Sequence, residues 1–485
     1  MELKNIHFIG INGSGIVGTA CIAKDRGYNV TGCDINESGA YSKQLLELGI
    51  KVEYGHDESH IGNNTDLVVL TPAVLYKDKY KNIPEIVKAF ETKKTIRWQQ
   101  FLGDYIMKNK NIIAICGTHG KTTTTTFTSL LLEKANFDPT CIIGGIVKEW
   151  EQNYRVGKSD WYTIEADEYA SNFMYYHPKY IVLNNIEMEH PEYFKDLNDY
   201  KENFSNFIKT IQDNGTIIFN YDDKNSYDIV KELSDYLKSK NVKILAITFD
   251  KNKNSDFCEL NYVDSNGFNG YSVYNENFEL KNVFGEHIIK DLAIVTVLAK
   301  NIGINTNNIN ELLKSFSGCG RRMDLICQKD NIVIYDDYGH HHTQLKYTLE
   351  ALRKKYNNEL IYIVFEPHLI SRFEQNSKEY LDYLQIADRA IITKFYKSRE
   401  SFRDDLDMDK YIKNIDKIKY IEDYDKIISD LDIFIKKNIN RNICILVMGA
   451  GNSYKITDKI EKYLNKWNGK YFRQNKFFKK QNNRS

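Results

Sequence analysis

The sequence has no excess of charge of either sign. Lysine plus arginine and aspartate plus glutamate each number 66 in 485 residues, so the formal net charge is zero. A protein that binds nucleic acid through its phosphates usually carries a net positive surface. The balance therefore predicts a protein that does not bind nucleic acid, although a local basic pocket for a small anion remains compatible with it.

Closely spaced cysteine pairs are also missing. None of the eight cysteines stands in a C-x-x-C pair. The pattern therefore argues against a zinc framework built on such pairs, and a chain of this length does not need disulfides to hold its core. We interpret the cysteines as small buried side chains of a protein in a reducing compartment.

Long apolar runs are absent as well. No stretch reaches the roughly 18 consecutive apolar residues that a membrane-spanning helix requires. The N-terminus, MELKNIHFIGINGSG, lacks a basic n-region and meets glycine too early for a signal peptide. We expect no membrane span and a cytoplasmic location.

The sequence does contain a repeated alternation of strand-like and helix-like stretches, which predicts parallel sheets. Its length suggests about three domains at ~150 residues each. We predict three α/β domains in series, each built on a mainly parallel sheet, at 1–107, 108–319 and 320–468, followed by a basic tail at 469–485. Strands are predicted at 5–10, 28–34, 66–74, 111–117, 161–168, 180–187, 215–223, 331–344, 360–368, 389–396 and 442–451.

A glycine-rich loop at 115–126, ICGTHGKTTTTT, joins a predicted strand to a predicted helix. Ile115 stands where the strict P-loop pattern requires glycine. The remaining loop still offers backbone N–H groups and a helix N-terminus to a phosphate, with Lys121 in reach of the outer phosphates and Thr122 able to offer a hydroxyl to Mg²⁺. The alternative is a glycine turn that only caps a threonine-rich helix.

A second glycine-rich turn, GINGSGIVG at 10–18, follows the first predicted strand, and Asp34 ends the second. A glycine turn, a helix N-terminus and an acid for a ribose hydroxyl are typical of nucleotide-binding folds. The turn therefore favours nucleotide or UDP binding, although such glycines also serve close packing.

Acids and a histidine follow two strands of the central domain. Glu165 opens the sequence EADE at the end of one strand, and His190 follows the next. Open α/β sheets bind ligands at the carboxyl ends of their strands, so we expect Glu165 to hold Mg²⁺ directly or through water, with His190 close by. The alternative is a surface cluster of acids and a loop histidine.

The third domain supplies Arg321 and Arg322, then Asp336 and Asp337, followed by three histidines at 340–342. Arginine neutralises phosphate charge through two parallel hydrogen bonds. Three adjacent histidines do not converge on one tetrahedral ion, so we favour helix capping and nucleotide contacts over a zinc site for them.

Taken in order, GTHGKTTT, EADE, NIE with His190, GRR, DDYGHH and a late GAGN resemble the Mur ligases. These enzymes form peptide bonds in peptidoglycan synthesis with ATP. Within the family, GINGSGIVG and the FEPH…SR stretch at 365–372 are similar to the motifs of the members that join L-alanine to UDP-N-acetylmuramate. The resemblance runs from about Asn5 to about Tyr454, and it implies Rossmann-like first and third domains around a P-loop-type ATPase domain.

The resemblance also implies groups of site residues, with ATP and Mg²⁺ as cofactors and no nucleic-acid partner. The UDP-sugar group is Gly10, Gly13, Ser14, Gly15 and Asp34. The ATP group is Gly117, Thr118, His119, Gly120, Lys121, Thr122, Thr123, His287, Asp291, Arg321 and Asp336. The metal group is Thr122, Glu165 and His190; the amino-acid group is His368 and Arg372; the catalytic group is Lys121, Glu165, His190, Arg322 and Asp337.

Five positions depart from the family pattern. Ile288 and Asp291 stand where asparagines are usual, His342 and Gln344 stand for proline and glutamate, and Leu369 replaces a polar residue. Three alternatives therefore stay open. The chain could add another amino acid or a recycled peptide, it could act on a different nucleotide-linked acceptor, or it could bind nucleotide without catalysis.

Overall fold

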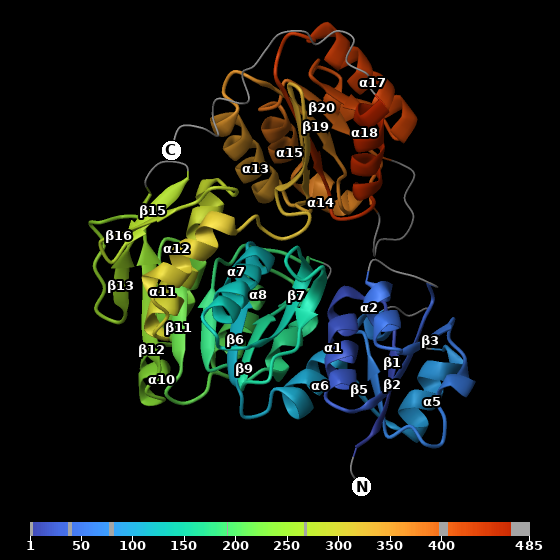
Figure 1. Cartoon of the computed structure of the whole chain (residues 1–485), viewed down its shortest axis with the longest axis vertical. Helices are drawn as coiled ribbons and strands as arrows, with labels where there is room; N and C mark the ends of the chain where they lie inside the picture. Colours follow the sequence, from blue (N-terminus) through green and yellow to red (C-terminus); the bar gives the residue numbers. More distant parts are fainter. Residues whose placement is uncertain are drawn as a thin grey trace. The chain divides into compact units, whose positions relative to one another are not determined.

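The computed structural model describes residues 3–36, 41–76, 82–191, 193–265, 269–396 and 406–466. They form two compact units, one of Met1–Asn282 with His287–Gly320 and the other of Val283–Glu286 with Arg321–Ser485 (Figure 1). The predicted tail at 469–485 lies outside the described residues, and the predicted domain boundaries stay predictions. Within the described ranges, no helix is long and apolar enough to cross a membrane.

The first unit begins with a five-stranded parallel sheet of order β3-β2-β1-β4-β5. Its strands are β1 (Asn5–Ile9), β2 (Asn29–Asp34), β3 (Lys51–Tyr54), β4 (Leu67–Leu70) and β5 (Lys94–Arg97). The helical segments around it are α1 (Ser14–Asp25), α2 (Ser42–Glu47), η1 (Glu58–His60), α3 (Ala73–Tyr76), α5 (Pro84–Thr92), α6 (Trp98–Phe101) and η2 (Leu102–Ile106).

The strands alternate in the side chains they present to the two faces of this sheet, as the pleat requires. Ile6 and Phe8 of β1 pack into the same core as α1, whereas Ile9 packs with Ile86 and Ala89 of α5 in a separate core. The two helices α1 and α5 therefore cover opposite faces of the sheet (Figure 1).

A larger, eight-stranded sheet of order β13-β12-β11-β10-β6-β9-β7-β8 follows in the same unit. Its strands are β6 (Asn111–Cys116), β7 (Thr140–Val147), β8 (Gln152–Arg155), β9 (Trp161–Glu165), β10 (Tyr180–Leu183), β11 (Thr216–Asn220), β12 (Lys243–Thr248) and β13 (Glu259–Tyr262). All pairings are parallel except β7 with β8. Its helices include α7 (Lys121–Lys134), η3 (Tyr169–Tyr175), α8 (Leu197–Ile208), α9 (Lys224–Glu232) and α10 (Ser234–Ser239).

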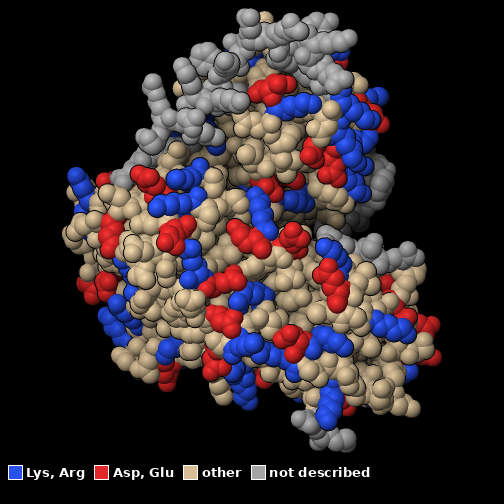
Figure 2. Space-filling model, in the orientation of Figure 1, with Lys and Arg blue, Asp and Glu red and all other residues tan. Residues whose placement is uncertain are grey.

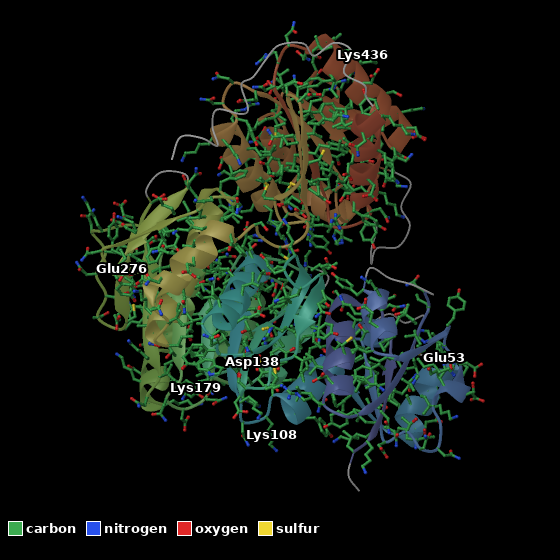
Figure 3. The ribbon with its side chains drawn as sticks, viewed as in Figure 1. Glu53, Lys108, Asp138, Lys179, Glu276 and Lys436 are labelled. Atoms are coloured by element: carbon green, nitrogen blue, oxygen red, sulfur yellow. The ribbon has the colours of Figure 1, made fainter. Side chains whose placement is uncertain are left out.

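A small antiparallel sheet, which the sequence pattern did not predict, completes the first unit. It has the order β14-β15-β16, from β14 (Asp264–Ser265), β15 (Gly270–Val273) and β16 (Glu276–Glu279). Glu276, labelled in Figure 3, accepts hydrogen bonds from Lys300 at 2.9 Å and Thr306 at 2.6 Å. These contacts tie the small sheet to α11 (Glu286–Asn301) and α12 (Thr306–Ser315).

The second unit holds a six-stranded sheet of order β17-β18-β22-β19-β20-β21. Its strands are β17 (Asp324–Lys329), β18 (Ile332–Asp337), β19 (Leu360–Phe365), β20 (Arg389–Ile392), β21 (Ile418–Tyr420) and β22 (Ile443–Met448). Only β17 pairs antiparallel. The helices are α13 (His342–Lys355), α14 (Ile370–Gln375), α15 (Ser377–Leu384), α16 (Asp409–Ile412), α17 (Tyr424–Lys437) and α18 (Tyr454–Lys466). The predicted α/β class with mainly parallel sheets is confirmed.

Several predicted strand ends were wrong. The strands predicted at 161–168, 180–187, 215–223, 360–368, 389–396 and 442–451 end three or four residues early, at Glu165, Leu183, Asn220, Phe365, Ile392 and Met448. Two further strands show why. The strand predicted at 66–74 ends at Leu70, because Pro72 has no N–H to donate and helix α3 begins at Ala73. The strand predicted at 331–344 ends at Asp337, and His341 already caps helix α13. Ala73 and Val74 are apolar, so composition did not show the end at Leu70. The residues past Asp337 are mostly polar, and the prediction carried that strand too far into the run that caps α13.

The histidine run at 340–342 serves helix capping, as predicted. His341 is the N-cap of α13, and its ring accepts a hydrogen bond from the backbone N–H of Thr343 at 3.4 Å. Gln344 reaches back to accept from the N–H groups of His340 at 2.9 Å and His341 at 3.1 Å. The pair is a capping box, in which glutamine serves as well as glutamate, so the departure at Gln344 preserves the local structure.

Charges of both signs are mixed over the molecular face drawn in Figure 2. Blue lysine and arginine side chains alternate with red aspartate and glutamate side chains in each unit. The sequence has equal numbers of the two kinds. On that face, the surface therefore does not present a broad field of one sign.

Gly15 has a packing role that is independent of any ligand. A Cβ at this position would lie 2.4 Å from the Trp98 ring, so the first turn of α1 can approach α6 only without a side chain. We expect Gly15→Ala to lower the free energy of unfolding by about 1–3 kcal/mol, because the ring must shift to admit the methyl group. Urea denaturation without ligand measures this effect.

The matched control is Gly62→Ala, whose Cβ would meet only the flexible side chain of Asn64. Equal denaturation midpoints for the two variants would show that the Trp98 contact does not constrain Gly15.

Candidate active site

The loop between β6 and α7 requires glycine at two positions. Gly117 has φ 132° and Gly120 has φ 82°, both in the region that favours glycine. A Cβ at Gly117 would lie 2.9 Å from the carbonyl oxygen of Asn185, and a Cβ at Gly120 would lie 2.4 Å from the carboxylate of Asp291. The loop is therefore packed closely against β10 and α11, at the carboxyl edge of the large sheet.

The start of α7 makes this edge attractive to an anion. Gly120 is its N-cap and Lys121 its first residue, so the N–H groups of the first turn point out of the helix end. The preceding N–H groups of Thr118 and His119 donate to the backbone and side-chain oxygens of Asn185, each at 2.9 Å. These bonds hold the loop in shape beside the helix N-terminus, the arrangement that binds phosphate in nucleotide sites.

Three other threonines of the run have structural partners. The hydroxyls of Thr125 and Thr126 donate at 2.7 Å to backbone carbonyls one turn earlier, those of Lys121 and Thr122. Thr124 accepts from the side-chain amide of Asn184 at 2.8 Å. Thr123 is buried on the same helix. Within this run, Thr122 is the residue whose hydroxyl meets a carboxylate.

Lys121 is held inside the loop by oxygen atoms. Its ammonium group donates to the carbonyls of Gly117 at 2.6 Å and Thr118 at 3.2 Å, and it pairs with Glu168 at 2.9 Å. Burial lowers the pKa of Lys121, but the carboxylates of Glu168 and Asp167 outweigh burial and raise the pKa above its usual value. Lys121 is therefore a permanent, pre-positioned cation beside the helix N-terminus.

Glu168 organises this cation, although it was not among the predicted site residues. Its carboxylate is fully buried, and it also accepts from the Tyr200 hydroxyl at 3.0 Å. Tyr200 in turn meets the Thr118 hydroxyl at 3.2 Å. The signal in the sequence was the second glutamate of EADE, which lies three residues beyond the end of β9 and pairs with Lys121 of the loop between β6 and α7.

Thr122 and Glu165 are brought together as predicted for a cation site. The Thr122 hydroxyl donates to one carboxylate oxygen of Glu165 at 3.1 Å, and the backbone N–H of Gly144 donates to the other at 2.8 Å. A hydroxyl and a carboxylate beside a phosphate loop are the oxygen ligands that Mg²⁺ prefers. The residues present therefore fit Mg²⁺, and Thr122 and Glu165 would hold it.

His190 lies in a second group at the same edge. Its imidazole is 3.9 Å from the Glu168 carboxylate and packs on the ring of Tyr169 at 4.9 Å. Donor atoms of His190, Asp167 and Glu168 lie within 4.8 Å of one another. The predicted metal set thus divides into a Thr122–Glu165 pair and a group of His190 with two acids, linked through Lys121 and Glu168.

Helix α11 carries two of the departures, and one of them lies at the loop. Asp291 is buried and accepts from the Asn184 side chain at 3.4 Å, next to Gly120. Ile288 is buried and contributes packing only. His287 is half-buried at the start of the helix. Asp291 therefore shapes the loop between β6 and α7, whereas any contact of His287 or Asp291 with adenine stays a prediction.

The turn at 10–18 is shaped by hydrogen bonds to Asp34. The Asp34 carboxylate accepts from the backbone N–H groups of Asn12 and Asn36, each at 3.0 Å. Gly10 has φ 76°, and Gly13 caps α1, whose first residue is Ser14. The five residues predicted for a UDP-sugar thus lie together at the carboxyl edge of the first sheet. There the Asp34 carboxylate holds the loop at Asn12 and the loop at Asn36 by hydrogen bonds, and we call this arrangement the braced turn.

Two arginines and two aspartates gather in the second unit. Arg321 donates at 2.7 Å to both the Gly449 carbonyl and the Ser453 hydroxyl, and its guanidinium lies 3.4 Å from Asp336. The guanidinium of Arg322 lies over the Tyr338 ring at 5.1 Å.

Asp337 lies beside this group and accepts from the N–H groups of Gly339 at 2.7 Å and Met323 at 2.8 Å. Its burial raises the pKa of Asp337, which the charge of Arg322 partly offsets. The second unit therefore presents two ordered cations next to two acids.

Asp336 predicts a pH dependence of stability. Burial raises the pKa of Asp336 to about 6, although Arg321 opposes the shift; in an unfolded chain the pKa is ~3.9. Because the folded state binds this proton more tightly, the free energy of unfolding should fall as the pH rises from ~4 to ~6. Asp336→Asn should reduce this decrease in the free energy of unfolding by up to about 3 kcal/mol.

Urea-denaturation midpoints measured across that pH range test this expectation. Asp425→Asn, at an exposed acid on α17, serves as the control. An Asp336→Asn profile as steep as that of the parent protein would show that Asp336 does not hold the proton.

The residues predicted for the amino acid lie after β19. The His368 ring lies 4.8 Å from that of His340 and 5.7 Å from that of Tyr396. Arg372 is buried on α14. Leu369, between them, has φ 67°, a conformation that costs a leucine roughly 1–3 kcal/mol and that clusters at functional sites. The strained backbone of Leu369 therefore determines how the chain passes from His368 into helix α14.

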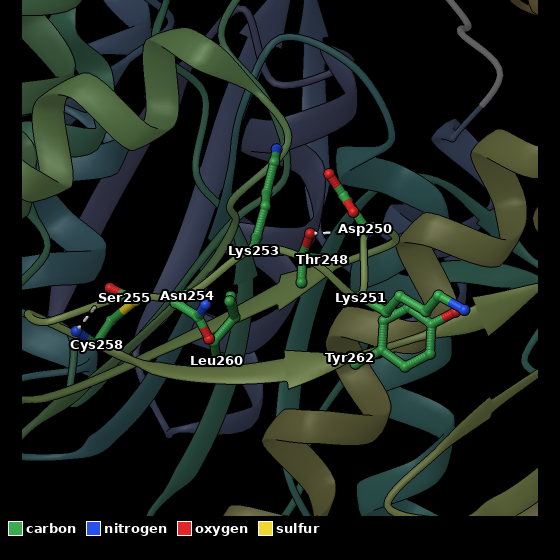
Figure 4. Close-up of a pocket in the computed structure, with 9 residues that line it drawn as sticks. All are labelled: Thr248, Asp250, Lys251, Lys253, Asn254, Ser255, Cys258, Leu260 and Tyr262. Atoms are coloured by element: carbon green, nitrogen blue, oxygen red, sulfur yellow. Dashed lines mark hydrogen bonds between the residues drawn. The ribbon is translucent and has the colours of Figure 1, made fainter.

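A hollow elsewhere in the first unit is not formed by the predicted site residues. It has a volume of about 220 Å³ and is lined by Thr248, Asp250, Lys251, Lys253, Asn254, Ser255, Cys258, Leu260 and Tyr262 (Figure 4). It lies around the connection between β12 and β13, and Lys253 pairs with Asp222 at 2.8 Å beside it. The hollow adds no residue to the site.

Three family models match the chain in succession. Residues 5–107 match the model described as Mur ligase family, catalytic domain. Residues 115–299 match the Mur ligase middle domain, and residues 321–451 match the Mur ligase, glutamate ligase domain. The three matched ranges correspond, in order, to the five-stranded, the eight-stranded and the six-stranded sheets described above.

Curated relatives are similar over most of the chain. The UDP-N-acetylmuramate–L-alanine ligase of Caldicellulosiruptor bescii is 34% identical over 466 residues, which cover 95% of this chain and 99% of that protein. The enzyme of the same name from Caldicellulosiruptor saccharolyticus is 36% identical over 404 residues, covering 82% of this chain and 85% of that protein.

Solved structures share the fold. The UDP-N-acetylmuramate–alanine ligase of Thermotoga maritima has a TM-score of 0.73 at 23% identity, covering 95% of this chain and 99% of that one. A murein peptide ligase of Psychrobacter arcticus has a TM-score of 0.65 at 23% identity, covering 96% and 99%. With family models matching in all three regions and relatives above 30% identity along nearly the whole length, the chain belongs to the Mur ligase family.

Proposed function

We propose that this chain joins L-alanine to the carboxylate of UDP-N-acetylmuramate, with conversion of ATP to ADP and phosphate, in the synthesis of the peptidoglycan precursor. The observation that carries this proposal is the 34% identity, over 95% of the chain, to a ligase of that name. The phosphate loop with its buried Lys121 supports the ATP-dependent step. We place the reaction in the cytoplasm.

The chemistry follows from what a free carboxylate lacks. It has no leaving group, and an amine would only exchange a proton with it. Transfer of the γ-phosphoryl group to a carboxylate oxygen gives an acyl phosphate and releases ADP. The amino nitrogen then attacks the acyl carbon, and inorganic phosphate leaves with that oxygen while the nitrogen gives up a proton.

Lys121 would stabilise the transferring phosphoryl group, whose oxygens carry the negative charge of the transition state. The ion pair with Glu168 at 2.9 Å holds the ammonium group in place before substrate arrives. Mg²⁺, when bound, neutralises phosphate charge in such transfers. Thr122 and Glu165 would hold the cation, with His190 close by in its group with Asp167 and Glu168.

The remaining assignments follow the motif positions. The turn formed by Gly10, Gly13, Ser14, Gly15 and Asp34 would bind the UDP-sugar. Arg321, Arg322, Asp336 and Asp337 would contact the nucleotide from the second unit. His368 and the guanidinium of Arg372 would receive the amino acid, since arginine suits the carboxylate that every amino acid carries.

Release of inorganic phosphate with ATP, Mg²⁺ and UDP-N-acetylmuramate, measured against each of the twenty amino acids, tests this function. We expect L-alanine to give the highest kcat/KM. A panel that includes the tripeptide of recycled peptidoglycan distinguishes the alternatives. Preference for the tripeptide would indicate a peptide-recycling ligase. The absence of phosphate release with every amino acid and peptide would contradict ligase activity with this acceptor.

A further inference from the structure

A buried carboxylate on a helix that covers the first sheet is surrounded by imidazole and thiol groups, none of which is among the site residues assigned above. Glu85 of α5 is fully buried. His7 of β1, His56 and His60 place ring nitrogens 3.3, 2.7 and 3.1 Å from its oxygens. The Cys33 sulfur of β2 lies 3.1 and 3.2 Å from the same two oxygens. We call these five residues the Glu85 cluster.

The donor atoms of four members have the spacing of a metal site. Donor atoms of His7, Cys33, His60 and Glu85 all lie within 4.8 Å of one another. Tetrahedral zinc, with bonds of 2.0–2.3 Å, holds its ligand atoms about 3.3–3.6 Å apart. Three of the separations, those from Glu85 Oε1 to His7, His60 and Cys33, are already 3.1–3.3 Å. A cation between these atoms requires only small side-chain movements.

The residues around the four donors orient them, as supporting residues do in metal sites. The Nδ1 atom of His7 lies 2.9 Å from the Thr31 hydroxyl, which leaves Nε2 directed at Glu85. His56 meets the second carboxylate oxygen, Oε2, at 2.7 Å. The Oε2 atom of Glu85 is therefore held by His56, while the Oε1 atom faces His7 and His60.

Charge balance favours a divalent cation over protons at this place. With a carboxylate, a thiolate and two neutral imidazoles, a Zn²⁺ ion gives a neutral site. Without a cation, the buried carboxylate of Glu85 is stabilised by hydrogen bonds from its neighbours alone, and a buried charge without a counter-charge is costly. Mixed nitrogen, sulfur and oxygen donors in a four-coordinate set are typical of zinc.

We propose that the Glu85 cluster binds a structural Zn²⁺ ion through His7, Cys33, His60 and Glu85. The ligands come from β1, β2, η1 and α5. The ion therefore links α5 and the 56–60 segment to the face of the sheet that α5 covers. Cys33 precedes Asp34, whose carbonyl accepts from Gly55 at 2.8 Å, next to His56. The ion thereby also steadies the strand end that carries Asp34. This site is separate from the proposed catalytic reaction.

Metal content of the full-length protein tests the proposal. The protein is stripped with a chelator, reloaded with Zn²⁺ in the presence of a reductant that is not a thiol, and desalted. We expect about one bound zinc per chain and a rise in the melting temperature on reloading. His60→Ala, at the most accessible of the four ligands, and Cys33→Ser should each lose the bound zinc.

Two matched controls should keep the zinc. His177→Ala removes an exposed histidine elsewhere in the first unit, and Cys21→Ser removes a buried cysteine of α1, which covers the opposite face of the sheet. Reloading with Co²⁺ adds a readout that only a thiolate ligand gives, a sulfur-to-cobalt charge-transfer band. This band should appear in the parent protein and in Cys21→Ser but not in Cys33→Ser.

Three results would overturn the proposal. The first is a parent protein that binds neither Zn²⁺ nor Co²⁺ after reloading, which would leave a hydrogen-bonded cluster without a metal. The second is zinc retained equally by His60→Ala and Cys33→Ser. The third is a Co²⁺ spectrum without the thiolate band. None of these readouts depends on ligase activity, so failure here leaves the proposed function intact.

Discussion

Lys121→Ala should lower kcat for ligation by at least about 1,000-fold, because the variant loses the cation that faces the transferring phosphoryl group. Binding of UDP-N-acetylmuramate should change little, since that ligand is expected at the braced turn of the first sheet. Product formation followed by mass spectrometry and UDP-sugar binding followed by calorimetry measure the two quantities separately.

Loss of Lys121 also leaves the buried Glu168 without its cation, which should destabilise the variant. The double variant Lys121→Ala/Glu168→Gln removes the unpaired charge, and it should recover stability without recovering activity. Lys134→Ala is the control, because Lys134 lies at the far end of the same helix and pairs with Glu311 on the surface. Robust ligation by Lys121→Ala would contradict the assignment of the phosphate loop.

Glu165→Gln should lower kcat by about 100–1,000-fold and raise the Mg²⁺ concentration needed for half-maximal rate. The change keeps the size of the side chain, but it removes the negative charge that would hold the cation. An amide nitrogen would also face the N–H of Gly144 or the hydroxyl of Thr122, both of which now donate to the carboxylate. Initial rates measured over a Mg²⁺ titration give both numbers.

Glu133→Gln makes the same change of charge on helix α7, where Glu133 accepts from Arg155 and Trp150 away from the phosphate loop. Its Mg²⁺ dependence should match that of the parent enzyme. An unchanged Mg²⁺ requirement in Glu165→Gln would remove Glu165 from the cation site and leave His190 with Asp167 and Glu168 as the place to examine.

The strands that carry the site residues could be predicted because each is a short apolar run. Strands with few apolar residues, such as β3 (KVEY), β5 (KTIR) and β17 (DLICQK), were not predicted, since their pairing depends on neighbours distant in the sequence. The glycine turn before α7 could also be predicted, since Gly117, Gly120 and Lys121 lie within five residues. Contacts between segments distant in the sequence were not visible. The packing of Asp291 on Gly120, and of Trp98 on Gly15, depends on how helices cross, which no local pattern encodes.

Glu168 shows a different limit. The sequence placed four residues, EADE, at one strand end, but it did not show which carboxylate faces the lysine. That choice is made by the left-handed turn at Ala170 and Ser171 and by the burial of Tyr200 against Glu168. The departures behaved similarly, because Gln344 proved to complete a helix cap and Ile288 to fill the core.

The Glu85 cluster could not be recognised from the spacing of its members along the sequence. Its members stand at positions 7, 33, 56, 60 and 85, and the cysteines show no paired spacing, so the pattern favoured ordinary buried thiols. Parallel strand order brings β1 beside β2, and α5 then covers the face on which His7 and Cys33 lie. A ligand set assembled by topology in this way cannot be recognised before the sheet order is known.

The fate of oxygen in the reaction tests the central claim most directly. UDP-N-acetylmuramate labelled with ¹⁸O in its carboxylate is incubated with ATP, Mg²⁺, L-alanine and the enzyme, and the products are weighed by mass spectrometry. The account predicts the alanyl product together with inorganic phosphate that carries one ¹⁸O atom from the carboxylate, since the acyl phosphate forms through that oxygen. Unlabelled phosphate, or no alanyl product, would contradict it.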